Sequence, residues 1–249
     1  MEGRNIKLLI AYDGTDFNGW QRQDGHVKLR TVQGVIEQAL KKLHGCQVNL
    51  TGSGRTDTGV HAIGQAANFY SNMESIPANR FVPALNCFLP RDARIIEASE
   101  TTNDFHARFN ACSRTYRYHF ICHPILPTEN RYNLPLYRFP RLDILNAYGR
   151  LLLGETDCSV FAAASEPDKS RNRYIYSAYF YAEGTRLIFE IRANAFLRKM
   201  VRSIAGTFLH YEERGAPPEK LLDIIKSGDR GLAGPTLPPQ GLFLWKVEY

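Results

Sequence analysis

Long uncharged stretches, paired cysteines and a cleavable leader are the features that this sequence lacks. The longest stretch without a charged side chain, Thr58 to Met73, contains Gly, His, Gln and Asn, so it cannot cross a bilayer. The apolar run Leu8 to Ile10 is too short for a signal peptide, and we expect none. The five cysteines are odd in number and form no Cys-x-x-Cys pair. They predict reduced thiols in a cytoplasmic protein.

The composition excludes a disordered or fibrous chain. Hydrophobic residues make up 44% of the sequence and charged residues 22%, which is typical of a globular protein. The 249 residues allow one large domain or two modules of about 100–150 residues each. A chain of this size buries about three-quarters of its unfolded surface, so its fold needs neither a metal nor a disulfide.

Positive charge is in excess and is unevenly placed. The formal net charge is +6, and the 31 cations are 22 Arg and 9 Lys. Two segments, Phe105 to His119 and Arg192 to Arg202, combine cations with aromatic residues and contain no acid. Phosphate contacts together with base stacking require such a mixture, so the pattern favours a nucleic-acid partner. The alternative is a pair of strands with solvated arginines on one face.

The apolar pattern predicts two halves, over residues 1–107 and 108–249. In the first half we expect a strand at 6–12, a helix at 32–44 between Thr31 and Gly45, strands at 47–52 and 62–70, a helix at 77–88 and a strand at 93–99. In the second half we expect a strand at 114–123, a helix at 141–153, strands at 174–182 and 187–193, helices at 196–211 and 218–226, and a strand at 242–249. This order predicts an α+β fold: two ferredoxin-like (split β-α-β) halves whose antiparallel sheets join around a central basic cleft.

The segment from Thr51 to Gln65, TGSGRTDTGVHAIGQ, is rich in glycine and carries a single acid. Asp57 is the only acidic residue between Glu37 and Glu74. A carboxylate on a Gly-rich loop of a basic protein would repel phosphate, so it has either a structural role in a turn or a chemical one.

Three common motifs come close to this segment and fail. A Walker loop needs a Lys that is absent here, and the dinucleotide fingerprint needs Gly where Asp57 stands. The tripeptide Asp-Thr-Gly at 57–59 matches aspartic proteases, but that chemistry needs a second carboxylate, which only a dimer could supply. A dimeric aspartic hydrolase therefore stays open as an alternative. No metal site is predicted, because the cysteines and histidines near residue 120 would point to opposite faces of one strand.

The same segment resembles the active-site segment of the tRNA pseudouridine synthase A (TruA) family, usually GAGRTDAGVHA-x-GQ. Five further blocks resemble that family in order and spacing: YDGTDFNGWQRQ (12–23), ALNCFLPRD (84–92), residues 105–118, ANAFLRKMVRSIAG (193–206) and AGPTLPPQGLFLWKVEY (233–249). The departures are mild: Ser53 and Thr58 replace small alanines, and Lys199 replaces a commoner His or Gln.

The resemblance implies an isomerase that converts uridine to pseudouridine at positions 38, 39 and 40 of the tRNA anticodon stem-loop, without a cofactor or a metal. It makes Asp57 the nucleophile, whether by attack on C1′, addition to the ring or a glycal route. Arg55 and Arg202 would supply positive charge that favours the ionised carboxylate. It also implies that the chain is a homodimer whose partner is the anticodon arm of tRNA.

The target uridine must leave the helical stack to be reached, so it needs a slot of its own. The resemblance selects Tyr116 as the residue that packs on the uracil and Leu242 as the residue that closes the other side. Tyr118 and Phe120 share the strand face of Tyr116 and are then core residues.

Cations at the start of the helix expected from Phe196 oppose the helix dipole, and a bound phosphate would reverse that effect. We therefore predict RNA-backbone contacts at Arg198 and Lys199, with further contacts at Arg108, Arg114 and Arg117. The alternative function is a non-catalytic RNA-binding module on a ferredoxin-like scaffold, although no RNP-type aromatic motif is present.

Overall fold

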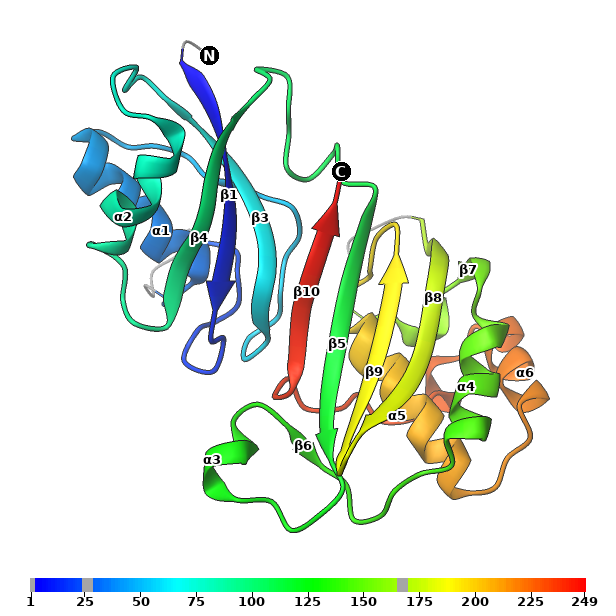
Figure 1. Cartoon of the computed structure of the whole chain (residues 1–249). Helices are drawn as coiled ribbons and strands as arrows, with labels where there is room; N and C mark the ends of the chain where they lie inside the picture. Colours follow the sequence, from blue (N-terminus) through cyan, green and yellow to red (C-terminus); the bar gives the residue numbers. More distant parts are fainter. Residues whose placement is uncertain (1–2, 24–28, 165–169) are drawn as a thin grey trace. The chain divides into compact units, whose positions relative to one another are not determined.

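The computed structural model describes residues 3–23, 29–164 and 170–249 of the chain (Figure 1). The chain divides into two compact units, which we call unit 1 (Met1–Cys112 with Phe243–Tyr249) and unit 2 (Ser113–Leu242). Both combine helices with mostly antiparallel strands, so the chain has the predicted α+β class. Unit 1 includes the end of the chain from Phe243 onward, where the final strand pairs with a strand of that unit.

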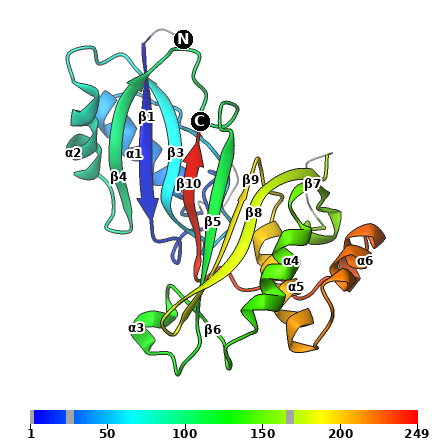
Figure 2. The same ribbon diagram turned by 45° about the vertical axis from the view of Figure 1, so that its right-hand side comes forward.

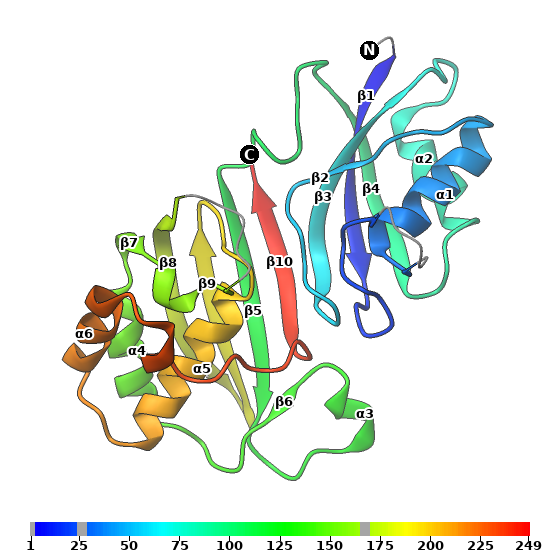
Figure 3. The same ribbon diagram turned by 180° about the vertical axis from the view of Figure 1, so that it is seen from behind.

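Unit 1 is a sheet with helices against one face (Figure 3). Its elements are β1 (Arg4–Tyr12), α1 (Val32–His44), β2 (Thr51–Gly52), β3 (His61–Ser71), a 3-10 turn (Ala78–Arg80), α2 (Phe81–Asn86), β4 (Ala93–Thr101) and β10 (Leu242–Glu248). The strand order is β4-β1-β3-β10, and β2 also pairs with β3. The β10 strand runs parallel to β3, with Phe243 opposite His61 and Leu244 opposite Ala62, whereas the other pairs are antiparallel.

The first helix begins and ends at the predicted residues. Thr31 caps α1, with its hydroxyl accepting from the Gly34 N–H at 3.3 Å, and Gly45 ends the helix in the left-handed conformation (φ 72°). Three apolar residues on one face of α1, Val32, Ile36 and Leu40, are fully buried. This helix therefore supplies much of the core of unit 1.

Unit 2 has the strand order β5-β9-β8-β7, with α4 and α5 against one face of that sheet (Figure 2). Its elements are β5 (Ser113–Ile121), α3 (Pro127–Asn130), β6 (Leu134–Pro135), α4 (Leu142–Leu151), β7 (Gly154–Asp157), a 3-10 turn (Ser159–Phe161), β8 (Asn172–Glu183), β9 (Arg186–Ala193), α5 (Met200–Glu213), α6 (Glu219–Ser227) and a 3-10 turn (Arg230–Leu232). Five stacked or tilted aromatic rings form the centre of its core: Tyr118, Phe120, Phe180, Phe189 and Phe208.

Several predicted elements differ from those observed. The helix expected at 77–88 is a 3-10 turn followed by the short α2, which carries Pro83 in its first turn, where proline is tolerated. The strand expected at 47–52 is reduced to β2, and the short elements α3, β6 and β7 were not predicted. The helix expected from Phe196 begins only at Met200, because Lys199 adopts a left-handed conformation (φ 62°) that an α-helix cannot contain.

A buried carboxylate links the end of α5 to the start of α4. Glu212 has a side chain only 2% exposed and accepts from both terminal nitrogens of Arg138 and from the Arg141 N–H at 3.0 Å. Burial alone would raise the pKa of Glu212, but the hydrogen bonds from Arg138 and Arg141 outweigh it, and the pKa lies below its ordinary value.

We expect Glu212→Gln to lower the free energy of unfolding at neutral pH by about 1–3 kcal/mol, because the Arg138 guanidinium and the Arg141 N–H lose their charged, buried acceptor. Since the folded-state pKa is depressed, this stabilisation is present above the unfolded pKa of about 4.3 and is lost as pH falls through the folded value. Urea unfolding between pH 3 and 7 measures both effects. Asp143→Asn, which removes an exposed ion pair with Arg141, is the control and should leave stability unchanged. A pH profile of Glu212→Gln as steep as that of the wild type would contradict this prediction.

Candidate active site

The Gly-rich segment forms a loop between β2 and β3, from Ser53 to Val60. Asp57 lies half-buried in this loop, and its carbonyl accepts from the Val60 N–H at 3.1 Å. The preceding carbonyl, that of Thr56, accepts from the Trp20 N–H at 3.1 Å. The backbone is therefore fixed on both sides of the carboxylate.

A buried pair of hydroxyls holds the residue that precedes the candidate nucleophile. Tyr12 Oη and Thr56 Oγ1 are 2.8 Å apart, and the two residues are only 4% and 7% exposed. Trp20 packs against the Tyr12 ring with 6.0 Å between centroids. Gly19 has φ 83°, and a Cβ at this position would lie 2.6 Å from the Thr56 carbonyl oxygen. Only glycine lets the segment before Trp20 approach the loop so closely.

One of the departures from the family pattern has a structural role. The Ser53 hydroxyl is buried and donates to Gln65 Oε1 at 2.7 Å, and Gln65 Nε2 donates to the Gly54 carbonyl at 3.0 Å. The extra hydroxyl thus joins the start of the loop to β3. Thr58, the second departure, is exposed, and nothing in the structure explains it.

Arg55 presents its guanidinium to solvent from the same loop. Its Nε donates to Gln21 Oε1 at 3.2 Å, and Gln21 Nε2 donates in turn to Gln33 Oε1 at 2.6 Å. Gln33 is buried at the start of α1. Sequence reasoning missed the two glutamines, although Gln21 belongs to a block that we had singled out.

The candidate base-binding residues of unit 2 are buried. Tyr116 lies on β5, is 8% exposed and contacts Phe196 edge-on, with 5.0 Å between ring centroids. Tyr118 and Phe120 are fully buried core residues, as predicted. Leu242, the first residue of β10, is 4% exposed.

Arg202 lies in the first turn of α5. Its Nε donates to the Leu237 carbonyl at 2.6 Å, and the Leu237 N–H donates to the Arg202 carbonyl at 3.3 Å. The next carbonyl, that of Pro238, accepts from the Tyr118 hydroxyl. Burial raises the pKa of Tyr118, and the positive charge of Arg202 opposes that rise. The positive charge of Arg202 therefore acts on Tyr118 in the buried core of unit 2.

The cations at 198 and 199 lie before the helix rather than on it. The Met200 N–H donates to the Leu197 carbonyl at 3.1 Å, so the chain makes a turn here before α5 begins. Lys199 is the only non-glycine residue with a positive φ in the part of the chain that the structure describes. The predicted cationic helix start is therefore wrong in one respect, because only Arg202 of that group stands in the first turn of the helix.

The arginines of β5 lie on different faces of the strand. Arg114 shares the face of Tyr116 by alternation and donates from Nη1 to the Asn194 carbonyl at 2.7 Å. Arg117 points to the other face, where its Nε donates to Glu190 Oε2 at 2.6 Å. The Glu190 carboxylate offsets part of the positive charge that Arg117 could offer to a phosphate.

The candidate residues thus form two groups, one in each unit. Unit 1 contains Asp57 and Arg55, together with Arg108, which is exposed and stands just before β5. Unit 2 contains the others: Arg114, Tyr116, Arg117, Arg198, Lys199, Arg202 and Leu242.

Comparison with known proteins identifies the family. A family model described as tRNA pseudouridine synthase matches residues 8–110 and 149–249, which include the Asp57 loop and α5. The chain belongs to the tRNA pseudouridine synthase family. It is 51% identical over 249 residues to tRNA pseudouridine synthase A of Treponema denticola, covering 99% of this chain and 93% of that protein. The identity is 46% over 235 residues to the protein of the same name from Treponema pallidum strain Nichols (93% and 84% covered), and 44% over 250 residues to that of Caldicellulosiruptor saccharolyticus (99% and 100%).

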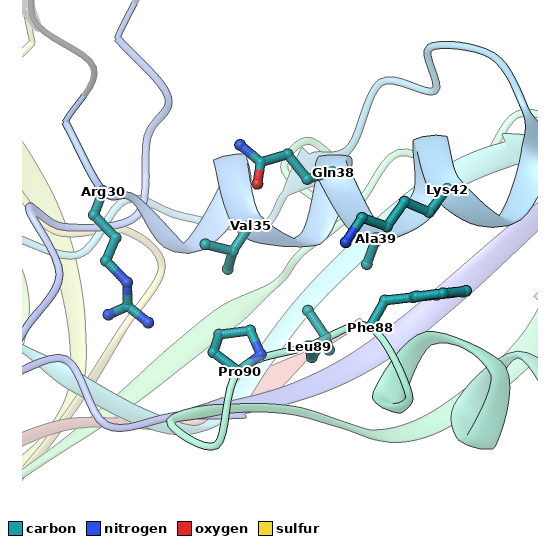
Figure 4. Close-up of a pocket in the computed structure, with 8 residues that line it drawn as sticks. All are labelled: Arg30, Val35, Gln38, Ala39, Lys42, Phe88, Leu89 and Pro90. Carbon is teal, nitrogen blue, oxygen red and sulfur yellow. The ribbon is translucent and has the colours of Figure 1, made fainter.

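A cavity of about 330 Å³ opens in unit 1 between α1 and the segment Phe88–Pro90 (Figure 4). Phe88, Leu89 and Pro90 form one side, and Lys42 reaches over the Phe88 ring at 5.7 Å. Its lining includes neither Asp57 nor Arg55. The residues that line this cavity are therefore not those of the loop on which the family motif lies.

Among the residues that the structure describes, no group of three or more His, Cys, Asp or Glu side chains is arranged to hold a metal ion. None of the described helices is both long and apolar enough to cross a membrane.

We expect Tyr12→Phe to lower the free energy of unfolding by about 1–3 kcal/mol, because the Thr56 hydroxyl would lose its buried partner. Urea unfolding of Tyr12→Phe, Thr56→Val and the double variant measures the coupling. The double variant should cost less than the two single variants added together. Simple additivity would mean that the two hydroxyls do not stabilise each other.

Proposed function

We propose that this chain isomerises uridine to pseudouridine in tRNA, at positions 38, 39 and 40 of the anticodon stem-loop. In that reaction the bond between N1 and C1′ breaks, and a bond between C5 and C1′ forms. The proton on C5 is lost to water or a base, and N1 gains one, so the uridine is rearranged without oxidation or reduction. No cofactor is required.

One observation carries this proposal. The loop GSGRTDTGVHAIGQ, which matches the family motif, holds its single carboxylate on a backbone fixed by the Val60 and Trp20 N–H groups. A nucleophile needs such positioning, because small displacements of a reacting group cost large factors in rate. We assign Asp57 as the nucleophile. Attack on C1′, addition to the ring and a glycal route all need the ionised carboxylate at this place.

The flipped uracil needs an apolar surface on each side. Tyr116, whose ring is held edge-on by Phe196, is our candidate for one side, and Leu242 for the other. Arg55 and Arg202 are our candidates for keeping Asp57 ionised. Our candidates for binding the RNA backbone are Arg108, Arg114, Arg117, Arg198 and Lys199.

The architecture proposed from the sequence is two ferredoxin-like halves around a basic cleft, in a homodimeric, cytoplasmic enzyme. The element order β1-α1-β2-β3-α2-β4, with both β2 and β4 flanking the β1–β3 pair, supports this for unit 1. Sedimentation of the purified chain with and without tRNA tests the dimer.

The decisive experiment follows the hydrogen on C5. Transcribed tRNA labelled with tritium at uridine C5 should release label to water when it is mixed with the protein. Replacing the uridines at 38, 39 and 40 by cytidine should abolish release, whereas replacing uridines elsewhere should not. Tight tRNA binding without any release of label would favour the non-catalytic RNA-binding module.

A further inference from the structure

Phe109 is far more exposed to solvent than the other phenylalanines that the structure describes. Its side chain is 77% exposed, whereas the next most exposed phenylalanines among the described residues, Phe88 and Phe139, are 44% and 43% exposed. A large apolar ring left in water forgoes the free energy that its burial would give. It lies in the segment from Phe105 to Asn110, which we call the 105–110 turn.

This turn is firmly anchored to the sheet of unit 1. Asn5 Nδ2 donates to the Phe105 carbonyl at 2.8 Å, and Asn68 Oδ1 accepts from the Ala107 N–H at 2.9 Å. The two asparagines are buried and bond to each other at 2.9 Å. The Tyr249 hydroxyl donates to the Ala107 carbonyl at 3.0 Å. The exposed ring therefore stands on a backbone that needs no ordering when a ligand binds.

A histidine fixes the orientation of the ring. His106 Nδ1 accepts from the N–H groups of Arg108 (3.2 Å) and Phe109 (3.3 Å), and the His106 N–H donates to Asn110 Oδ1 at 2.6 Å. The imidazole stacks on Phe109 with 4.3 Å between centroids and 27° between planes. The His106 imidazole thus packs on one face of the Phe109 ring and fixes the orientation of that ring.

The charge around this surface suits a polyanion. The Arg108 guanidinium lies 5.8 Å from the centre of the Phe109 ring. No acidic residue occurs in the sequence between Asp104 and Glu129. A rigid aromatic ring beside a guanidinium is an arrangement that can stack an unpaired base and contact its phosphate.

We propose that Phe109 is a stacking platform for an unpaired base of the RNA substrate, distinct from the reacting uridine, with Arg108 contacting the adjacent phosphate. The proposal rests on the proposed function only in that the ligand is RNA. Stacking on a phenyl ring is tolerant of base identity, so the site contributes affinity rather than sequence selection.

The test compares RNA affinity with turnover. Fluorescence anisotropy with an unstructured single-stranded RNA and with tRNA should give about tenfold weaker binding for Phe109→Ala. Phe109→Trp should retain wild-type affinity, and its added indole fluorescence should be quenched by the single-stranded RNA. In the tritium assay Phe109→Ala should raise KM and leave kcat within about twofold, because no reacting atom is involved.

The salt dependence of RNA affinity distinguishes base stacking by Phe109 from phosphate binding by Arg108. The dependence of log Kd on log salt should be unchanged in Phe109→Ala but should fall by about 0.7–0.9 in Arg108→Gln, which removes one phosphate contact. Tyr137→Ala, which removes a fully exposed aromatic ring elsewhere, is the matched control and should bind RNA like the wild type. Phe109→Leu keeps the apolar bulk without the π face, and it should bind nearly as weakly as Phe109→Ala.

Other results would overturn the inference. Unchanged RNA affinity in folded Phe109→Ala or Phe109→Leu would exclude stacking. A lower sedimenting mass with unchanged RNA affinity would assign Phe109 to an interface with a second copy of the chain. If the wild type releases no tritium but Phe109→Ala still weakens single-stranded RNA binding, the proposed function fails and the stacking platform stands.

Discussion

Asp57→Asn should abolish tritium release from labelled tRNA, with a loss of at least about four orders of magnitude in rate, because removal of a nucleophile commonly costs that much. Asn has nearly the same shape, so the bonds from the Val60 N–H to residue 57 and from the Trp20 N–H to Thr56 should persist. The loop then keeps its conformation, and tRNA binding should stay within a few-fold of the wild type. Single-turnover release of label and filter binding measure the two quantities on the same preparation.

The matched control is Glu74→Gln, which neutralises an exposed carboxylate of unit 1 outside the loop. It should leave both rate and binding unchanged. Release of tritium by Asp57→Asn at more than about a hundredth of the wild-type rate would remove Asp57 from the role of nucleophile. Full loss of tRNA binding would instead assign the carboxylate a structural role in the loop.

Gly14→Ala should reduce the rate of tritium release by about 100-fold and the free energy of unfolding by about 1–3 kcal/mol. A Cβ at this position would lie 2.0 Å from the Val60 carbonyl oxygen and 2.5 Å from its carbon, so the backbone of Val60 must move. The Val60 N–H holds the Asp57 carbonyl, and the Gly14 N–H itself donates to His61 Nδ1 at 3.1 Å. One added methyl group would therefore displace the loop that carries the nucleophile.

Gly45→Ala is the control for Gly14→Ala, because it should lower the stability of the fold without displacing the loop that carries Asp57. Gly45 ends α1 with φ 72°, and a Cβ there would meet nothing within 4 Å, so the cost is the backbone strain of about 1 kcal/mol. We expect reduced stability with an unchanged rate. If Gly14→Ala lost stability but released tritium as fast as Gly45→Ala, the contact with Val60 would not position the nucleophile.

The elements predicted well from the sequence are those with strong local signals. Thr31 and Gly45 bound α1 because a capping hydroxyl and a left-handed glycine act within one turn of the helix. Asp57 could be singled out because it is the only acid in a long basic and neutral stretch. In both cases residues close together in the sequence are enough to make the prediction.

The elements predicted poorly depend on distant contacts. The left-handed Lys199 has no sequence signature, so the start of α5 was placed at Phe196 instead of Met200. The strand β7 (GETD) is short and polar, and its pairing with β8 alone defines it. The bond between Tyr12 and Thr56 joins residues far apart in the chain, and hydrophobic periodicity carries no information about such a bond.

The parallel pairing of β10 with β3 has a consequence for biosynthesis. Phe243 and Leu244 leave the ribosome only after the whole of unit 2, so the edge of β3 at His61 and Ala62 has no partner for most of translation. An unpaired strand edge is a site where nascent chains associate wrongly. Fragments that stop before Phe243 should for this reason precipitate more readily than the 249-residue chain.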